Sequence, residues 1–373
     1  MPGLGIEKHP AREIRPLGRI DGLPASVRDQ ANRNQIPIEK AKLEQQIATD
    51  TAALQNDPKD ASAAWDRDDQ QNRLKDLEAV QRQLTKTPDA KLMVFDMNSG
   101  RHGHAALAFG DPDTANHVSV TTPGLNTTVR DSLGDMSDEA QALKRQAERD
   151  LRKAGRSDES VASISWIGYD APLKDGNEIG NVAAEGRAQE GAKALASFYN
   201  GVDVASAQNQ PHITALGHSY GSLTTSLALQ QDHGRGVQDV VFYGSPGLGD
   251  SNAAMRALDV THIPTGGIND AVQSPASLGM NPGHVYEMTD RGDLIANLNA
   301  FGRSPNEIPW ITHLGTGQIT VDGKTYTEGT GHAEYGRSES NPSSPGYHNL
   351  HRSGYNLAAI VAGLPDYATN PPS

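Results

Sequence analysis

One serine of this sequence lies in a setting that could make it a nucleophile. Ser219 is the centre of Gly217-His-Ser-Tyr-Gly221, which follows the apolar run His212–Leu216 and precedes a helical pattern from Ser222. Gly-x-Ser-x-Gly between a strand and a helix is typical of a nucleophile elbow, a strained turn that exposes the serine hydroxyl. The two glycines leave room for neighbouring backbone. The sequence therefore predicts that Ser219 attacks an acyl carbon.

A serine hydroxyl needs a base, and a neutral imidazole is the usual one because its pKa lies near the operating pH. In this arrangement the acid and then the histidine follow the serine along the chain. The candidate histidines downstream are His284, His313, His332, His348 and His351. His332 is favoured because its loop, Gly329–Tyr335, is rich in glycine and has room to present an imidazole. His348 and His351 precede an apolar helical pattern, where capping or packing is the commoner role, and they stay as alternatives.

The acid of such a triad is expected on a loop that follows a strand beyond the elbow. The segment Thr261–Asp270 has this position, and Asp270 is therefore the predicted acid. Asp250 and Asp259 are the alternatives. Asp250 follows a turn and could instead cap a helix.

Two backbone amides are expected to stabilise the oxyanion that forms during attack. The first is Tyr220 N–H, at the start of the helix whose N-terminal dipole points at the serine. The second is Leu125 N–H, which follows Pro123-Gly124 in the loop after an early strand. An ordinary turn is the alternative interpretation of the Leu125 loop.

Strands and helices alternate around the elbow and must position these residues. The runs expected to form strands are residues 91–95, 105–109, 117–121, 161–167, 212–216, 239–243 and 261–267. Helical patterns cover about 137–154, 183–199, 222–230 and 251–258. Strands that alternate with helices through short connections predict an α/β fold with a mostly parallel central sheet and helices on both faces.

A helical hairpin is expected before this α/β region. In each half of residues 26–87, apolar side chains fall on one helix face: Leu43, Ile47 and Leu54, then Leu74, Leu77 and Leu84. Asn56-Asp57-Pro58 predicts a turn between the halves. We therefore divide the chain into residues 1–88, an extended segment with the hairpin, and residues 89–373, the α/β domain. The hairpin is interpreted as an accessory pair packed on that domain, with a possible protein partner as the alternative.

The composition argues against several classes of protein. With 33 basic and 46 acidic residues the formal net charge is −13, which disfavours nucleic acid. There is no cysteine, and no metal-binding motif or nucleotide-binding glycine loop is recognised, so we expect neither metal nor cofactor. The chain has no long apolar stretch and its first residues lack a signal-peptide core. These features predict a protein without an integral membrane segment, either cytoplasmic or exported without an N-terminal signal peptide.

Several blocks of the sequence occur together in one known family. They are Phe109–Val118 with Pro123-Gly124, Trp166–Pro172, the elbow Gly217–Ser222, Gly244–Gly247, and Gly331-His332 with Tyr335. Together they resemble the α/β-hydrolases of actinobacteria that carry the domain of unknown function 1023. The resemblance implies an α/β-hydrolase fold, a Ser–Asp–His triad and esterase or lipase activity.

The resemblance assigns the family's serine to Ser219 and its histidine to His332. The segment Asn269–Val272, which contains Asp270, matches the family's Asp-x-Val element only in part. A long insert between Tyr335 and Tyr355 departs from the family pattern. Because this insert contributes two extra histidines, His348 and His351 remain alternative bases.

The main hypothesis from the sequence is a serine esterase or lipase-like enzyme that cleaves a small-molecule or lipid acyl ester. Ser219 attacks, His332 transfers the proton and Asp270 fixes the imidazole tautomer. Peptidase, thioesterase and acyltransferase chemistry stay open because one triad supports all of them. The competing hypothesis is a non-catalytic interaction protein that keeps the hydrolase scaffold and binds a partner through its helical hairpin.

Overall fold

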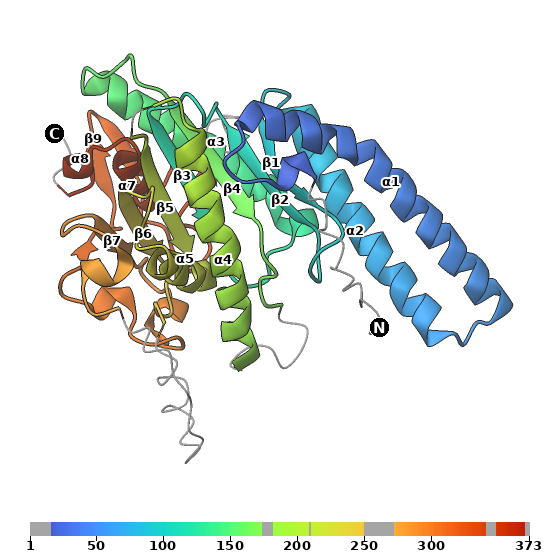
Figure 1. Cartoon of the computed structure of the whole chain (residues 1–373). Helices are drawn as coiled ribbons and strands as arrows, with labels where there is room; N and C mark the ends of the chain where they lie inside the picture. Colours follow the sequence, from blue (N-terminus) through green and yellow to red (C-terminus); the bar gives the residue numbers. More distant parts are fainter. Residues whose placement is uncertain (1–15, 174–181, 209, 250–271, 341–347, 370–373) are drawn as a thin grey trace, which may run out of the picture.

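A central sheet of eight strands organises the molecule in this computed structural model, which describes residues 16–173, 182–208, 210–249, 272–340 and 348–369 (Figure 1). Its strands are β1 (Lys91–Asp96), β2 (His104–Phe109), β3 (His117–Thr122), β4 (Val161–Ile167), β5 (His212–His218), β6 (Asp239–Tyr243), β7 (Val285–Met288) and β8 (Thr312–His313). They lie in the order β1-β2-β4-β3-β5-β6-β7-β8. The pairs β1–β2 and β2–β4 are antiparallel, and all later pairs are parallel. The mostly parallel sheet predicted from the sequence is confirmed.

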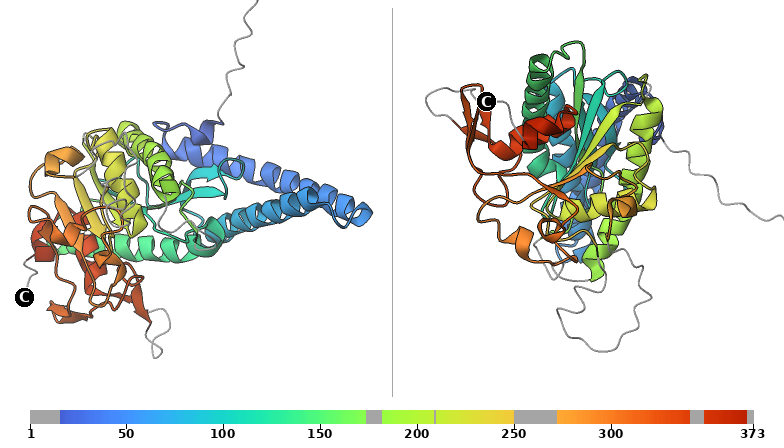
Figure 2. Two further views of the ribbon diagram at one scale, coloured as in Figure 1. Left: turned by 90° about the horizontal axis from the view of Figure 1, so that it is seen from below. Right: turned by 90° about the vertical axis from the view of Figure 1, so that its left-hand side faces the viewer.

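Helices cover both faces of this sheet, also as predicted (Figure 2). The α-helices are α1 (Ala25–Asn56), α2 (Ala61–Lys86), α3 (Val129–Lys153), α4 (Val182–Ala205), α5 (Tyr220–Gln231), α7 (Arg352–Val361) and α8 (Pro365–Thr369). Two small two-stranded sheets pair β9 (Ile319–Val321) with β10 (Lys324–Tyr326) and β11 (Ser338–Ser340) with β12 (His348–Leu350). Four short 3-10 helices lie among the described residues, at Leu17–Arg19, Pro275–Leu278, Ile295–Asn297 and Pro305–Glu307.

Adjacent residues of the central strands face opposite helix layers. Ala215 of β5 packs in the cluster that contains Leu223 of α5 and residues of α4. Its neighbour Leu216 packs in the cluster that contains Leu151 of α3 and Ile360 of α7. Because side chains alternate along a strand, a strand buried on both faces must be apolar nearly throughout, which explains the continuous hydrophobic runs in the sequence.

One predicted helix begins earlier than expected, two strands were not predicted, and two predicted elements lie outside the described residues. The helix expected from residue 137 begins at Val129, because the Thr128 side chain accepts a hydrogen bond from Asp131 N–H and caps an earlier start. The sequence interpretation missed the short strands β7 and β8. The predicted helix at 251–258 and strand at 261–267 lie outside the described residues.

The predicted N-terminal hairpin is present and is formed by α1 and α2. Asp60 caps α2 by accepting hydrogen bonds from the N–H groups of Ser62 and Ala63. One end of the hairpin packs beside β1 and β2, and the other projects away from the sheet domain (Figures 1 and 2). Near the projecting tip, Trp65 is 70% exposed. None of the helices in the described residues is long and apolar enough to span a bilayer.

The packed end of the hairpin shares a hydrophobic cluster with the sheet domain. Leu77 and Val80 of α2 lie in the same cluster as Leu92 of β1, Leu107 of β2 and Leu133 of α3. All five side chains are fully buried. At roughly 1.5–3 kcal/mol per fully buried aliphatic side chain, this contact contributes substantially to folding. The hairpin is therefore packed on the domain, as expected for an accessory pair.

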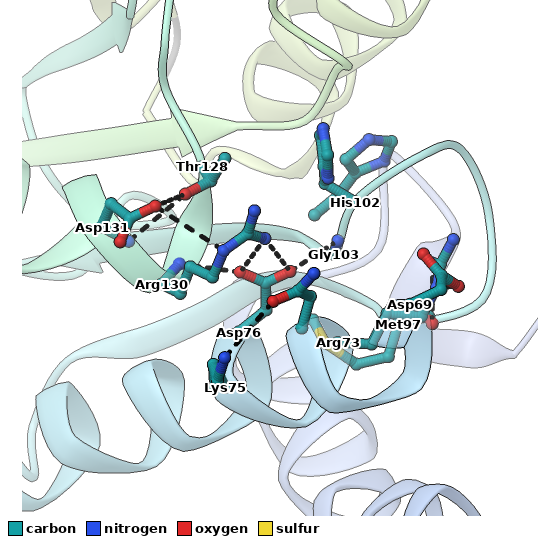
Figure 3. Close-up of polar contacts among 12 residues, drawn as sticks. Asp69, Arg73, Lys75, Asp76, Met97, His102, Gly103, Thr128, Arg130 and Asp131 are labelled. Atoms are coloured by element: carbon teal, nitrogen blue, oxygen red, sulfur yellow. Dashed lines mark hydrogen bonds and ion pairs between the residues drawn. The ribbon is translucent and has the colours of Figure 1, made fainter. Parts of the chain in front are cut away.

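A buried carboxylate also joins the hairpin to the domain (Figure 3). Asp76 of α2 is 0% exposed and accepts hydrogen bonds from Gly103 N–H at 3.0 Å and Arg130 N–H at 2.8 Å. The Arg130 guanidinium lies 3.3 Å from both of its oxygens. Burial raises the pKa of Asp76, and the Arg130 charge and the two amides act against that rise. One side chain thus connects α2, the β1–β2 loop and the first turn of α3.

We expect Asp76→Ala to lower the free energy of unfolding by about 3–5 kcal/mol, because it leaves two buried amides and an arginine without their acceptor. Urea denaturation followed by circular dichroism measures this loss. The matched control is Asp68→Ala on the same helix, since the Asp68 side chain is 62% exposed and pairs with its neighbour Arg67. Equal stability of the two variants would contradict the anchoring role of Asp76.

Candidate active site

The predicted elbow is a strained turn in the structure. Ser219 lies between β5 and α5 with φ 54° and ψ −129°, a conformation that residues other than glycine rarely adopt. Its backbone N–H donates to the Tyr243 carbonyl of β6 at 3.0 Å, which fixes the turn to the neighbouring strand. The residue is only 3% exposed. The strained conformation is maintained because β5 before it, α5 after it and the hydrogen bond to β6 all fix the backbone at Ser219.

Two glycines allow the backbone to pack closely around Ser219. A Cβ at Gly221 would collide with the carbonyl oxygens of Thr122, the last residue of β3, and of Pro123 in the loop that follows. A Cβ at Gly124 of the same loop would lie 2.6 Å from Ser219 Cβ and 2.9 Å from Ser219 Oγ. The absence of both side chains therefore brings the loop that carries Leu125 directly against the serine.

An imidazole lies within hydrogen-bond distance of the serine hydroxyl. His332 Nε2 is 2.6 Å from Ser219 Oγ, and His332 Nδ1 is 3.0 Å from both oxygens of Asp293. A carboxylate at Nδ1 favours the tautomer with the proton on Nδ1, which leaves Nε2 to accept the serine proton. Ser219, His332 and Asp293 thus form a continuous hydrogen-bonded chain.

Asp293 follows β7 and is buried among donors. Its Oδ1 accepts hydrogen bonds from Ile295 N–H at 3.0 Å and Ala296 N–H at 3.1 Å, and its Oδ2 accepts one from the Tyr335 hydroxyl at 2.7 Å. Burial by itself would raise the pKa of Asp293, but the hydrogen bonds from His332 and Tyr335 outweigh it and hold the pKa below its usual range. The carboxylate therefore stays ionised at neutral pH.

A second imidazole supports the loop that carries His332. His218, inside the elbow, donates from Nε2 to the His332 carbonyl oxygen at 2.8 Å. Burial first, and then the nearby His332, lower the pKa of His218 to about 4, so its ring is neutral at pH 7. His218 also lines the pocket at the serine.

A pocket of about 360 Å³ opens in front of Ser219 and His332. The residues that line it come from the loop after β3, from α3 and from the His332 loop, and include Leu125, Asn126, Asp131, Asp135, Met136, Glu139, Ile295 and Arg337. Arg337 lies 3.5 Å from Asp135 and 3.6 Å from Glu139. Burial raises the pKa of Glu139 to about 7. One wall of the pocket is thus acidic, with a single arginine opposite three carboxyl groups.

The sequence comparisons agree with this geometry. Residues 98–273 match the family described as alpha/beta hydrolase. An uncharacterized protein of Mycobacterium tuberculosis is 37% identical over 287 residues, which are 75% of this chain and 96% of that protein. A second uncharacterized protein of Mycobacterium tuberculosis is 31% identical over 306 residues, which are 79% of this chain and 44% of that protein. The chain belongs to the α/β-hydrolase family.

The solved structures to which this chain is similar include esterases. An arylesterase has a TM-score of 0.35 and 11% identity, with 78% of this chain and 91% of that chain covered. A thermophilic carboxylesterase from a metagenomic library has a TM-score of 0.38 and 13% identity, with 78% and 95% covered.

Within this hydrolase, the other candidate histidines whose side chains are described have partners away from the serine. His284 Nδ1 lies 2.9 Å from Asp239, and His313 Nδ1 lies 2.8 Å from Glu287. His351 precedes α7, and its Nδ1 lies 3.0 Å from the Thr327 hydroxyl. His348 is the first residue of β12. Among the imidazoles proposed as the base, the structure brings His332 to Ser219.

The structure does not test the predicted acid, but it places another carboxylate against His332. Asp270, the predicted acid, and its alternatives Asp250 and Asp259 lie outside the described residues. The carboxylate in contact with His332 is Asp293, which the sequence interpretation did not consider. The only signal was weak: the short run Val285–Met288, which includes Glu287, followed by the polar turn Thr-Asp-Arg-Gly-Asp.

The two residues predicted to supply the oxyanion donors both lie near the serine. Tyr220 is the first residue of α5, and Leu125 lines the pocket beside Ser219. Within the part of the chain that the structure describes, no group of three or more His, Asp or Glu side chains is arranged to hold a metal ion. The groups at this site that can take part in acyl transfer are the serine, the imidazole, the carboxylate and the backbone amides.

Proposed function

We propose that this α/β-hydrolase is a serine esterase that cleaves acyl esters through an acyl-enzyme. The observation that carries the proposal is the 2.6 Å contact of Ser219 Oγ with His332 Nε2, backed by Asp293 at His332 Nδ1. A nucleophile, a base and a group that orients the base are the three parts that acyl transfer requires. Asp293 takes the role that the sequence interpretation gave to Asp270.

In the proposed mechanism Ser219 Oγ attacks the ester carbonyl carbon while His332 Nε2 takes its proton. The oxyanion that forms is stabilised by the N–H groups of Tyr220 and Leu125, an effect worth about 3 kcal/mol per donor. The imidazolium then gives the proton to the departing alkoxide. A water molecule, deprotonated by His332, attacks the acyl-enzyme in the same way and releases the acid.

The pocket supports a substrate of small or medium size. Its volume of about 360 Å³ is at the lower end of the range for ligand sites, which favours short acyl chains over long ones. The carboxyl groups of Asp131, Asp135 and Glu139 disfavour an anionic group near α3. We therefore propose neutral esters with short or medium acyl chains as substrates, and we place lipase-like long-chain esters second.

Two finer assignments belong to the same proposal. The first is membership of the actinobacterial branch with the domain of unknown function 1023, which the shared sequence blocks support. The second is the division at residue 88, with a hairpin that packs on the α/β domain and could bind a protein partner with its projecting end. The hydrophobic cluster shared by α2 and β1 suggests that the two parts fold together.

The proposal is tested with a fluorophosphonate probe and a series of p-nitrophenyl esters from acetate to palmitate. We expect covalent labelling at Ser219, located by peptide mass spectrometry, and the highest kcat/KM at short or medium chain length. Parallel assays with thioesters and p-nitroanilides distinguish thioesterase and peptidase activity. A folded protein that is not labelled and turns over none of these substrates would favour the non-catalytic interaction protein.

A further inference from the structure

One tyrosine contacts the acid of the triad. The hydroxyl oxygen of Tyr335 lies 2.7 Å from Asp293 Oδ2 and 2.7 Å from the backbone nitrogen of Asp290. The side chain is 1% exposed, and its ring packs against those of His218 and Tyr243. Tyr335 is on the same loop as His332, so one loop provides both the base and a donor to the acid.

The two contacts fix the direction in which this hydroxyl donates. The Asp290 nitrogen is an amide N–H, which can only donate, so the hydroxyl oxygen accepts there. The one hydroxyl proton is then directed at Asp293. Burial raises the pKa of Tyr335 far above its usual range, so the hydroxyl keeps its proton.

The carboxylate of Asp293 is thus held in one orientation by donors on both oxygens. Oδ1 accepts from the N–H groups of Ile295 and Ala296, and Oδ2 accepts from Tyr335. Rotation of the carboxylate would break at least one of these hydrogen bonds. With both oxygens fixed, the carboxylate holds His332 Nδ1–H and so aims Nε2 at Ser219.

We infer that Tyr335 is a positioning residue of this active site, whose hydroxyl fixes the Asp293 carboxylate and through it the His332 imidazole. The inference rests on the esterase function proposed above. Tyr335 is the last residue of the Gly-His-x-x-Tyr block, Gly331–Tyr335. The inference gives this tyrosine a role in the reaction and not only in packing.

The test is Tyr335→Phe, which removes the hydroxyl and keeps the ring. We expect kcat to fall about tenfold, which corresponds to one charge-assisted hydrogen bond, with KM within about twofold of the wild type. We also expect the acidic limb of the kcat/KM profile to move to higher pH. The less stabilised Asp293 carboxylate attracts the imidazolium more strongly, so the base becomes protonated at higher pH.

Other titratable groups near His332 could affect the same pH profile. They are Ser219 and His218 at the elbow, Asp290 and Asp293 after β7, Glu139 on α3, and Glu334, Tyr335 and Arg337 on its own loop. Asp290 matters most, because burial raises the pKa of its carboxyl to about 7. Asp290→Asn keeps the backbone N–H to Tyr335, so repeating Tyr335→Phe in that background shows whether the shift needs the Asp290 carboxyl.

Tyr355→Phe on α7 is the matched control, a buried tyrosine whose hydroxyl has no hydrogen-bond partner among the described residues. We expect its kcat and pH profile to equal those of the wild type. A Tyr335→Phe enzyme with wild-type kcat and an unmoved acidic limb would overturn the inference, whatever its melting temperature. So would a shift that vanishes in the Asp290→Asn background. If the wild type itself neither reacts with fluorophosphonate nor turns over esters, the proposed function fails instead.

Discussion

Ser219→Ala should abolish ester turnover, with kcat reduced by a factor on the order of 10⁶, as expected when the nucleophile of a serine triad is removed. The substitution deletes the one atom that forms the acyl-enzyme, and the pocket around it offers no second hydroxyl 2.6 Å from His332 Nε2 among the described residues. The fold should survive, because the alanine keeps the backbone turn and its hydrogen bond to Tyr243. The turnover of p-nitrophenyl butyrate, followed by absorbance, measures the effect.

Ser119→Ala provides the control for this experiment. Ser119 is also fully buried in the sheet, but its hydroxyl donates to Ser163 on β4 and lies outside the pocket. We expect this variant to keep wild-type turnover and fluorophosphonate labelling. Residual turnover by Ser219→Ala within tenfold of the wild type would contradict the proposed nucleophile and require another group for the chemistry.

The serine could be proposed from the sequence because its signal is local. The elbow consists of five contiguous residues, Gly217–Gly221, and the strand before them and the helix after them are contiguous with it as well. The φ of 54° at Ser219 is the backbone strain that this motif predicts. The mostly parallel sheet could be predicted for a similar reason, since strands such as β4 are buried over their whole length and their sequences are largely apolar.

The carboxylate that contacts His332 could not be located in this way because its position depends on tertiary structure. The strand that precedes it, β7, has only four residues and includes Glu287, whose carboxylate contacts His313. A run this short and this polar carries little periodicity. Without a recognised strand there, the sequence interpretation placed the acid after the predicted strand at residues 261–267, at Asp270, which lies outside the described residues. Contacts that hold His332, such as the His218 hydrogen bond to its carbonyl, likewise join residues far apart in the sequence.

Asp293→Asn is expected to lower kcat by about 10⁴ with the fold intact, the effect that loss of the orienting carboxylate has in serine triads. An asparagine amide would donate its N–H₂ to His332 Nδ1 and favour the tautomer with the proton on Nε2. That nitrogen could then no longer accept the proton of Ser219.

The acidic limb of the wild-type profile of kcat/KM against pH should report the imidazole and not Asp293, because the pKa of Asp293 is held below its usual range. For the same reason the ionised carboxylate stabilises the fold above the unfolded-state pKa of about 4 and loses this contribution as the pH falls through its lower folded pKa.

The comparison that decides the acid is Asp293→Asn against Asp270→Asn, assayed with the same ester at the same pH. Asp293 is fully buried and contacts both His332 and Tyr335, so the loss should fall on this variant alone. If Asp270→Asn abolished turnover and Asp293→Asn did not, the acid predicted from the sequence would be right and the Asp293 contact would be structural. Melting temperatures at pH 7 and at about pH 3, below the unfolded-state pKa of an aspartate, separate the two roles of Asp293. The difference in stability between the wild type and Asp293→Asn should shrink at the lower pH. The difference in turnover does not depend on this difference in stability, as long as both proteins stay folded.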